Sequence, residues 1–278
     1  MFENIAIVGV GLIGGSIGMA ARKNRLAHRI IGAGRRQSSI DKALRKGAID
    51  KGTLKLKDAV SDAELIVIAT PVDKVIAKIK EVSIHAKKGA IIMDVNSTKE
   101  PVLKEADKII NKGLFFVGTH PVAGSEQSGV LSGNPELFKD TICIITPTDK
   151  TDKYALKKVE SFWKSLGAIT KTMSGKEHDR IIANISHLPH LVAYALCDTI
   201  PQKDLIFSGT GLRDTTRIAK SSPGMWQDIF MQNQTALLKA IEAFQDKVKA
   251  LKSDIKKGSR DVILEKLSRA ERRRRGIG

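Results

Sequence analysis

The sequence predicts a doubly wound α/β domain over residues 1–172, followed by an all-helical domain over residues 173–278. In the first part, short β-branched runs alternate with longer helical patterns, which is typical of a parallel sheet covered by helices on both faces. In the second part, amphipathic helical patterns follow one another with few strand signals. The chain of 278 residues has the length of two modest domains.

The predicted strands are continuous apolar runs rather than alternating ones. Both faces of the sheet are therefore expected to be buried. A sheet of this kind binds its ligands at the carboxyl ends of its strands. The expected strands are Ile5–Val8, Arg29–Ala33, Leu65–Ala69, Ala90–Val95, Leu114–Val117, Thr141–Ile145 and Ala168–Thr172.

The helical part is expected to begin with a helix over residues 174–199, in which Pro189 predicts a kink. Apolar residues at three- and four-residue steps predict one long amphipathic helix over residues 223–257. A last helix is expected at about residues 259–269, followed by a basic, disordered tail. Because these helices are long for so short a domain, we expect a homodimer formed through this part.

Composition narrows the classes of partner. The chain has 47 Lys and Arg against 30 Asp and Glu, a net charge of +17, so we expect anionic ligands. A nucleic-acid partner is disfavoured, because aromatic residues make up only 4% and the lysines are scattered.

The sequence also bears on the compartment. No apolar run approaches the roughly 18 residues of a membrane-spanning helix, so no membrane partner is expected. The N-terminus lacks a signal-peptide pattern, and we expect a cytoplasmic protein. Cys143 and Cys197 lie in apolar surroundings and are expected to be buried thiols.

A glycine-rich motif, GVGLIG, follows the first strand directly and opens a helical segment. This context is typical of a dinucleotide-binding, Rossmann-type turn. Gly9 permits the tight turn, Gly11 lets the backbone approach a pyrophosphate, and Gly14 lets helix and strand pack closely. Leu12 and Ile13 complete the turn, whose backbone N–H groups would bind the anion at the helix N-terminus.

The residues after the second strand favour NADP over NAD. An NAD site typically has an acidic residue there, about 20 residues beyond the glycines, to bind the ribose 2′-hydroxyl. Here Arg35 and Arg36 follow Gly34, and Ser38 comes two residues later. Guanidinium and hydroxyl groups suit a 2′-phosphate. The alternative is a solvated basic loop.

Two further strand ends carry candidate residues. Thr70 and Pro71 follow the third predicted strand and are expected to contact the cofactor. Ser97 follows the fourth, where its hydroxyl either faces the nicotinamide or caps the next helix; Thr98 is the other candidate cap.

His187 and His190 are three residues apart and share one face of their predicted helix. Such a pair could bind a metal ion, but no third ligand stands at a suitable spacing, and nicotinamide chemistry needs none. We therefore expect no metal.

Three further motifs occur in a fixed order: THPVAGSE at residues 119–126, SHLPH at 186–190 and GLRDTTRIA at 211–219. Together they resemble the prephenate/arogenate dehydrogenase family of tyrosine biosynthesis. The resemblance extends from the first strand to the helix after Trp226. It implies a dinucleotide-binding domain followed by a helical dimerisation domain.

The resemblance implies an oxidative decarboxylation, in which hydride leaves the hydroxyl-bearing ring carbon for the nicotinamide and the ring carboxylate leaves as carbon dioxide. His120 matches the family's catalytic histidine, the acceptor for the hydroxyl proton, and Ser97 matches a serine beside it. Arg217 matches the arginine that binds a substrate carboxylate. The resemblance also places these residues in the substrate pocket: Glu126, His187, His190, Trp226 and Arg213. Arg213 is equally compatible with a structural ion pair to Asp214, and His178-Asp179 is expected to be structural.

The expected function is therefore a prephenate dehydrogenase that yields 4-hydroxyphenylpyruvate, for which His190 is typical. An NADP-dependent arogenate dehydrogenase, which yields tyrosine, is the alternative that Arg35 and Arg36 favour. A β-hydroxyacid dehydrogenase is less compatible, because such enzymes rely on a lysine rather than on motifs like those of His120 and Arg217. Thr210 departs from the family pattern, which usually has glycine there.

Overall fold

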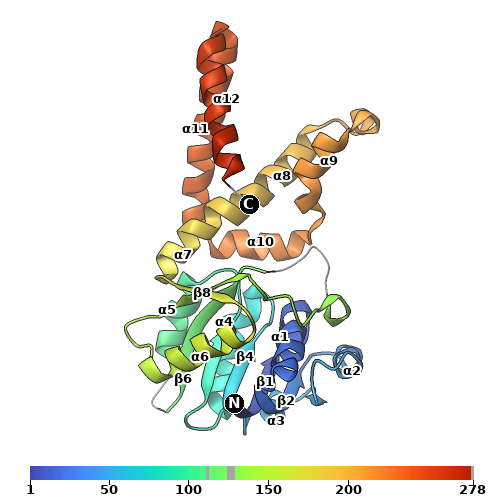
Figure 1. Ribbon diagram of the computed structural model, residues 1–278, viewed down its shortest axis with the longest axis vertical. Coiled ribbons are helices and arrows are strands. Elements are labelled where there is room, and N and C mark those ends of the chain that lie inside the picture. The colour runs from blue at the N-terminus through green and yellow to red at the C-terminus, as the bar shows by residue number, and fades with distance from the viewer. Residues whose placement is uncertain (111–112, 124–128, 277–278) are drawn as a thin grey trace. The chain divides into compact units, whose positions relative to one another are not determined.

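The computed structural model describes residues 1–110, 113–123 and 129–276 (Figure 1). Contacts divide the chain into two compact units, Met1–Asn233 and Gln234–Gly278. The first unit contains the whole sheet and the helices up to residue 232. The division predicted at residue 172 coincides with the end of the last strand rather than with the boundary between these units.

The first unit is built on an eight-stranded sheet with the order β3-β2-β1-β4-β5-β6-β7-β8. Neighbouring strands are parallel except for β6 and β7, so the expectation of a mainly parallel sheet is confirmed. The strand β3 was not predicted, because its three residues, Lys-Gly-Thr, form no apolar run. The strands are β1 (Phe2–Val8), β2 (Ala27–Ala33), β3 (Lys51–Thr53), β4 (Leu65–Ile68), β5 (Ile91–Asp94), β6 (Phe115–Pro121), β7 (Ile142–Thr146) and β8 (Ile169–Thr172).

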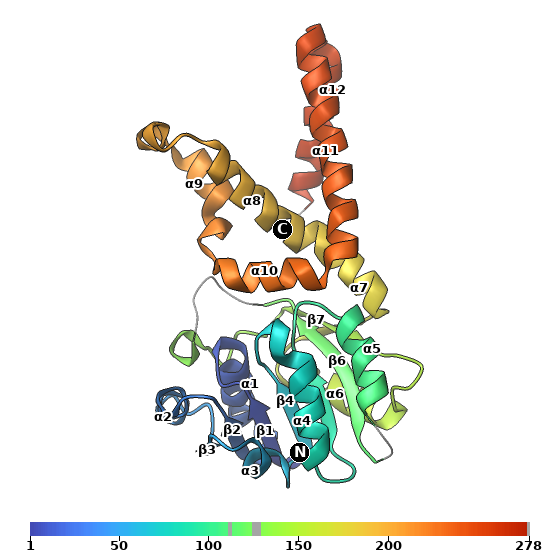
Figure 2. The same cartoon turned by 180° about the vertical axis from the view of Figure 1, so that it is seen from behind.

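Helices cover both faces of this sheet, as Figure 2 shows from behind. In β1, Ile5 and Ile7 belong to the core on one face, and Ala6 and Val8 to the core on the other. This explains why the strands are apolar without alternation. One face packs against α1 (Leu12–Lys23), α2 (Gln37–Arg45) and α6 (Lys153–Ser165), and the other against α3 (Leu56–Val60), α4 (Val75–His85) and α5 (Glu100–Ile109).

Strand β6 is longer than its parallel neighbour. Its pairing with β5 ends where Asp94 lies opposite Gly118. The next residues, Thr119 to Pro121, pair with the antiparallel strand β7. His120 therefore lies on a strand extension at the carboxyl edge of the sheet, where ligands of such sheets bind.

The predicted helix over residues 174–199 is interrupted by a π-helical turn. Helix α7 (Gly175–Ile182) leads into this turn (Ala183–His187), and α8 (Leu188–Thr199) follows it. Pro189 has no N–H group and its ring crowds the carbonyl group four residues earlier, which belongs to Ile185. The wider turn accommodates both effects, so the expected kink takes the form of a π-turn.

The remaining part of the first unit is helical. It consists of a 3-10 helix (Gln202–Phe207), α9 (Thr210–Thr216), a 3-10 turn (Arg217–Lys220) and α10 (Pro223–Gln232). Of the two cysteines, Cys143 is buried as expected, but Cys197, in α8, is exposed. No helix in the described part of the chain is long and apolar enough to cross a bilayer.

The prediction of one helix over residues 223–257 is wrong, because α10 ends at Gln232 and α11 (Gln234–Lys257) begins after Asn233. Asn233 has φ −108° and ψ 31°, outside the helical range. Its buried side-chain amide donates a hydrogen bond to the main-chain oxygen of Asp179, 2.8 Å away. Asparagine commonly replaces helical hydrogen bonds by contacts of this kind.

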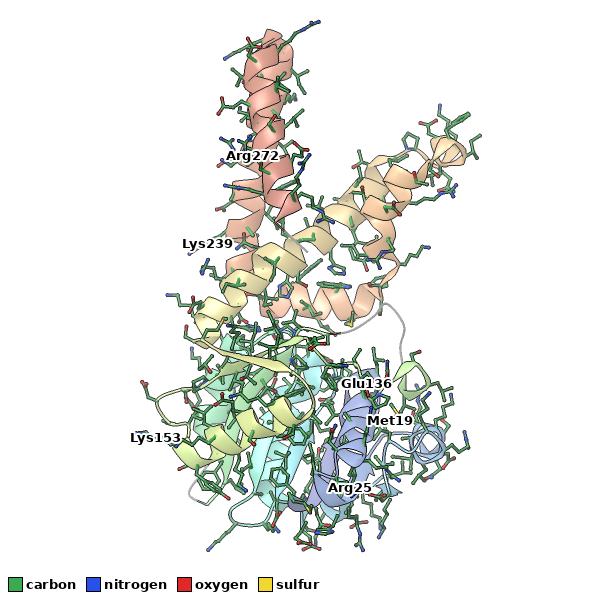
Figure 3. All side chains as sticks on the ribbon, viewed as in Figure 1. Met19, Arg25, Glu136, Lys153, Lys239 and Arg272 are labelled. Carbon is green, nitrogen blue, oxygen red and sulfur yellow. The ribbon has the colours of Figure 1, made fainter. Side chains whose placement is uncertain are left out.

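The second unit is a pair of helices, α11 and α12 (Arg260–Arg275), joined by a turn in which Gly258 has φ +66°. An ion pair between Lys266 and Asp254 links them. The helix α12 continues six residues past its predicted end, so the arginine run is helical, not a disordered tail. Side chains such as Lys239 and Arg272 stand out from the two helices (Figure 3). Large apolar side chains are exposed among them: Leu238, Phe244, Val248, Ile255, Val262, Leu264 and Leu267.

Candidate active site

The glycine-rich turn between β1 and α1 has the geometry that an anion site needs. Gly9 has φ +101°, and a Cβ atom there would lie 2.5 Å from the oxygen of Ala69. A Cβ atom on Gly14 would lie 2.1 Å from the oxygen of Gly9. By contrast, a Cβ atom on Gly11 would have nothing within 4 Å. The first and third glycines thus permit close packing, and the second leaves open space at the helix N-terminus, which fits a pyrophosphate.

A cleft of about 450 Å³ opens beside this turn. Its lining includes the acidic side chain of Glu81, which is paired with Lys78 at 2.5 Å. Ser38 is exposed and does not line the cleft, whereas the neighbouring hydroxyl residue Ser39 does. Lys42, which was not predicted, also lines it. Leu12, Ile13 and Gly14 lie just inside α1 and are also not part of the lining. The predicted residues that do line it are Gly9, Gly11, Arg35, Arg36, Thr70 and Pro71.

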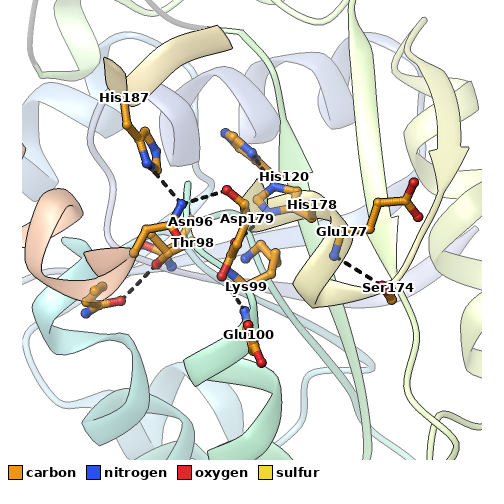
Figure 4. A network of polar contacts seen from close by, with 12 residues as sticks. Asn96, Thr98, Lys99, Glu100, His120, Ser174, Glu177, His178, Asp179 and His187 are labelled. Atoms are coloured by element: carbon orange, nitrogen blue, oxygen red, sulfur yellow. Dashed lines mark hydrogen bonds and ion pairs between the residues drawn. The ribbon is translucent and has the colours of Figure 1, made fainter. Parts of the chain in front are cut away.

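His120 is 8% exposed, and its Nδ1 atom lies 2.8 Å from Nε2 of His178 (Figure 4). The Nδ1 atom of His178 lies in turn 2.7 Å from Oδ1 of Asp179. Burial, followed by the neighbouring His178, Lys99 and His187, holds the pKa of His120 well below its usual value. His120 is therefore a neutral imidazole at neutral pH.

The carboxylate of Asp179 also caps helix α5. Oδ1 accepts a hydrogen bond from the backbone N–H of Lys99, and Oδ2 accepts one from that of Glu100, each at 2.8 Å. Neither Ser97 nor Thr98 caps this helix, which corrects one of the two interpretations of that segment. Ser97 is half-buried in the loop between β5 and α5.

Gln232, at the end of α10, connects two loops at the carboxyl edge of the sheet. Its Oε1 accepts a hydrogen bond from the hydroxyl of Thr98 at 2.8 Å, and its Nε2 donates one to the main-chain oxygen of Val72 at 2.7 Å. Trp226 and Ile229 of the same helix pack on Val72. These contacts hold α10 against the segment that follows Thr70 and Pro71.

A fully buried ion pair lies under the site. It joins Lys99 and Asp94, and both side chains have no exposed surface. The second carboxylate oxygen of Asp94 and Nδ2 of Asn96 are buried and have no hydrogen-bond partner among the described residues. The charge of Lys99 is one of the influences that keep His120 neutral.

The π-turn, α8 and α10 bring together three of the predicted substrate residues, His187, His190 and Trp226. The ring of His190 stacks on Trp226 with centroids 3.6 Å apart, and His187 meets the indole edge-on with centroids 6.0 Å apart. Nδ1 of His187 accepts a hydrogen bond from Nδ2 of Asn233 at 3.1 Å. Nε2 of His187 and Nε1 of Trp226 are buried without a hydrogen-bond partner in the described structure. Burial lowers the pKa of His187 to about 4.

The predicted arginines lie on exposed helical turns. Arg217 begins the 3-10 turn after α9, and its charge, after burial as the larger cause, lowers the pKa of His190. It therefore lies close to the stacked His190 and Trp226 rings. Arg213 donates a hydrogen bond to the main-chain oxygen of Ser208 at 3.2 Å. Glu126 lies outside the described residues.

The described residues thus combine a dinucleotide-type cleft with a buried neutral imidazole at the same edge of the sheet. They contain no group of three or more His, Cys, Asp and Glu side chains placed to bind a metal ion. A neutral imidazole beside such a cleft can accept the hydroxyl proton of an alcohol while its carbon loses hydride.

Comparisons with known proteins show which family this chain resembles. The family model described as "Prephenate dehydrogenase, nucleotide-binding domain" matches residues 17–172. The model described as "Prephenate dehydrogenase, dimerization domain" matches residues 174–269. The chain is 38% identical to the prephenate dehydrogenase of Bacillus subtilis over 246 residues, covering 86% of this chain and 66% of that protein. It therefore spans about two thirds of that relative's length.

Two solved structures are similar over nearly their whole length. One is the prephenate dehydrogenase of Aquifex aeolicus in complex with hydroxyphenyl propionate and NAD+, with 36% identity, a TM-score of 0.94, and coverage of 100% of this chain and 99% of the other. The other is the arogenate dehydrogenase of Synechocystis, with 27% identity, a TM-score of 0.85, and coverage of 99% and 100%.

Proposed function

Since this chain belongs to the prephenate dehydrogenase family, we propose that it oxidises and decarboxylates prephenate to 4-hydroxyphenylpyruvate and transfers a hydride to NAD(P)+. The observation that carries this proposal is the buried, neutral His120 at the carboxyl edge of the sheet that also forms the dinucleotide cleft. A hydride acceptor and a proton acceptor at one edge suit the oxidation of a hydroxyl-bearing carbon.

The cofactor residues of this chain are those of the glycine turn and the cleft. Gly9, Gly11 and Gly14 shape the turn, and backbone N–H groups of Leu12 and Ile13 at the start of α1 face a pyrophosphate. When bound there, a nicotinamide dinucleotide supplies the acceptor for the hydride. Thr70 and Pro71 line the same cleft, on the side of β4.

His120 accepts the proton of the substrate hydroxyl as the ring carbon loses hydride, and returns it to the oxygen as the ring becomes aromatic. The neutral state that burial imposes on His120 is the state this role requires. Ser97, in the loop beside it, orients the hydroxyl or the imidazole. The hydroxyl group remains on the product, so the reaction releases carbon dioxide without net gain or loss of a proton.

The substrate is a dianion, and we assign its carboxylates to the helical side of the first unit. Arg217, supported by Arg213, offers a planar fork to one carboxylate. The unpaired buried N–H groups of His187 and Trp226 provide hydrogen-bond donors that the described protein does not use. His190 and Glu126 complete the proposed substrate residues.

We assign NADP as the preferred cofactor. Arg35, Arg36, Ser39 and Lys42 line the cleft after β2, where an acidic residue would bind the 2′-hydroxyl of NAD. A site with three cations and a hydroxyl suits a 2′-phosphate. We keep Ser38 as a supporting residue only, because its side chain is exposed outside the lining. The relative from A. aeolicus was solved with NAD+.

An NADP-dependent arogenate dehydrogenase is the second candidate, supported by the similarity to the enzyme from Synechocystis. The two substrates differ in one side chain, where arogenate has an ammonium group and prephenate a keto group. The charge of Arg217, which acts on His190, favours prephenate, because Arg217 would repel the ammonium group of arogenate if that group were bound beside His190.

We also propose a homodimer that forms through the helical part, residues 173–278. The match to the family's dimerization domain supports it, as do the exposed apolar side chains of α11 and α12. A group of exposed apolar side chains on paired helices commonly marks a protein interface. Residues 1–172 form the dinucleotide domain in this proposal.

Initial rates with prephenate and arogenate, each with NAD+ and NADP+, test the function directly. We expect turnover of prephenate with NADP+ to have the highest kcat/KM. His120→Asn should lower kcat by about 10²–10⁴-fold at an unchanged Tm. Absence of hydride transfer in all four combinations would refute the proposed function, and a higher kcat/KM for arogenate would favour the second candidate.

A further inference from the structure

We propose that His178, oriented by Asp179, is a positioning residue that fixes the tautomer of His120, so that Nε2 of His120 always presents its lone pair to the substrate hydroxyl. The proposal rests on the proposed function, in which His120 accepts that proton. The hydrogen-bond chain Asp179–His178–His120, with distances of 2.7 and 2.8 Å, carries it.

The direction of the chain is set at Asp179. Its carboxylate already accepts backbone N–H groups from Lys99 and Glu100, one on each oxygen. A carboxylate engaged in this way is an acceptor for its remaining partner. Nδ1 of His178 therefore carries a hydrogen and donates it to Oδ1 of Asp179.

The donor and acceptor roles in the hydrogen bond between His178 and His120 follow from this assignment. Burial lowers the pKa of His178, so its ring is neutral and holds one hydrogen, on Nδ1. Nε2 of His178 is then an acceptor. Because it lies 2.8 Å from Nδ1 of His120, the hydrogen between them belongs to His120. The neutral ring of His120 has no second hydrogen, so its Nε2 is left with a lone pair.

Among the described residues, no other group near His120 would set the tautomer in this way. The charged and titratable groups that act on it are His178 from α7, Lys99 from the loop before α5 and His187 from the π-turn. The ammonium group of Lys99 forms an ion pair with the carboxylate of Asp94. In the described structure only His178 among these is within hydrogen-bond distance of the His120 ring.

The consequence for catalysis is geometric. A neutral imidazole has two tautomers, and only the one with a bare Nε2 accepts a proton on the side away from His178. Without His178 the ring can also place its hydrogen on Nε2, where it donates to the substrate hydroxyl instead of accepting from it. An enzyme whose histidine adopts the wrong tautomer loses turnover while its binding surfaces stay intact.

Nitrogen NMR of the histidine side chains tests the proposal without any substrate. The chain has six histidines, so the signals can be assigned by single substitutions. In the unmodified protein at pH 7.5 we expect His120 to carry its hydrogen on Nδ1 and to show a bare Nε2. In His178→Leu the His120 signals should shift toward the other tautomer. His28→Gln, at an exposed position, serves as the control and should leave them unchanged.

Kinetics provide the second readout. His178→Leu should lower kcat by about 10- to 10³-fold with KM for substrate and dinucleotide changed less than about threefold. His178→Gln, whose side-chain oxygen can accept from Nδ1 of His120, should retain more of kcat than His178→Leu. In a His120→Asn background, His178→Leu should have almost no further effect on kcat, because residues that act as a unit are not additive.

A hydrogen on Nε2 of His120 in the unmodified protein would overturn the proposal by itself, even if a variant failed to fold. Independent, additive losses in the double variant would overturn it as well. These outcomes are distinct from a failure of the proposed function, since the NMR result stands whether or not prephenate is turned over.

Discussion

Trp226 stacks on His190, with the ring planes 23° apart and the centroids 3.6 Å apart. The two residues come from α10 and α8, so the stack joins two helices that each carry a proposed substrate residue. Trp226 is 6% exposed and packs on Val72, in the segment that follows the proposed cofactor residues Thr70 and Pro71. Trp226 therefore links the proposed substrate residue His190 to the segment that carries the proposed cofactor residues.

Trp226→Phe is expected to raise KM for prephenate by about three- to tenfold while kcat changes little. Phenylalanine can keep the aromatic contact with His190, but it removes the buried indole N–H that the described protein leaves unpaired. An ordinary hydrogen bond contributes about 0.5–1.5 kcal/mol net, and this range covers a three- to tenfold change in KM. Steady-state kinetics with saturating cofactor measure this.

The matched control is Trp163→Phe. Its indole N–H is also buried and unpaired among the described residues, but it lies in the core between the sheet and α6. This variant should lower Tm and leave KM unchanged. Equal effects of the two substitutions on KM would contradict a substrate role for Trp226.

Gly11→Ala should weaken dinucleotide binding by at least about tenfold and leave Tm nearly unchanged. A Cβ atom there meets no protein atom within 4 Å, but it occupies the open space of the cleft. Gly14→Ala should instead destabilise the fold. We expect it to lower the unfolding free energy by about 2 kcal/mol or more, because its Cβ would overlap the oxygen of Gly9. Cofactor titration by fluorescence and thermal unfolding of both variants separate the two effects. Loss of stability in Gly11→Ala would show that its role is packing.

The double variant Arg35→Ala/Arg36→Ala should raise KM for NADP+ by about tenfold or more, and change KM for NAD+ by less than about threefold, since only the former has the 2′-phosphate. Lys42→Ala should produce a smaller loss in the same direction. Arg45→Ala, at the end of α2 and outside the cleft, is the control. Retention of full NADP preference by the double variant would refute the cofactor assignment.

Acid should destabilise the protein between about pH 6.5 and pH 4. His120, His178 and His187 are buried, and burial is the main cause that lowers the pKa of each. Their stabilisation is present above the unfolded pKa of about 6.5 and is lost as pH falls, because the unfolded chain binds protons that the folded chain does not. For His187, with a folded pKa of about 4, this amounts to about 3 kcal/mol.

Urea unfolding at pH 7, 6, 5 and 4 measures this loss. His187→Gln, which can still accept a hydrogen bond from Asn233, should have a shallower decline over the same range. An identical decline in the variant would mean that carboxylates, and not His187, are responsible.

Most of the sheet could be predicted from the sequence, because buried parallel strands leave long apolar runs. The strand β3 has no such run, and its Lys-Gly-Thr sequence gives no signal. The break between α10 and α11 at Asn233 also could not be predicted from the sequence. The apolar spacing continues through it, and the break is fixed by a hydrogen bond to Asp179, 54 residues away.

The candidate site was predicted where residue type and motif agree, as for Gly9, Gly11 and His120. The supporting residues could not be found in this way. Gln232 connects the loops after β4 and β5 through contacts with Thr98 and Val72, and nothing in its local sequence indicates them. The cap of α5 was assigned to a neighbouring hydroxyl, but a carboxylate distant in sequence supplies it. Such partners depend on tertiary folding.

The π-turn at Ala183–His187 has a consequence for how this protein and its relatives diverge. A π-turn contains one residue more than the α-helical turn it replaces. Because the wider turn takes up the extra residue, deleting a single codon there would return the segment to a regular α-helix and leave α8 facing nearly the same way, with His190 still beside Trp226. Deleting a codon inside α8 would instead rotate the residues after it by about 100° around the helix axis. The π-turn is thus a place where a lineage can lose a residue and keep the set of groups that α8 presents.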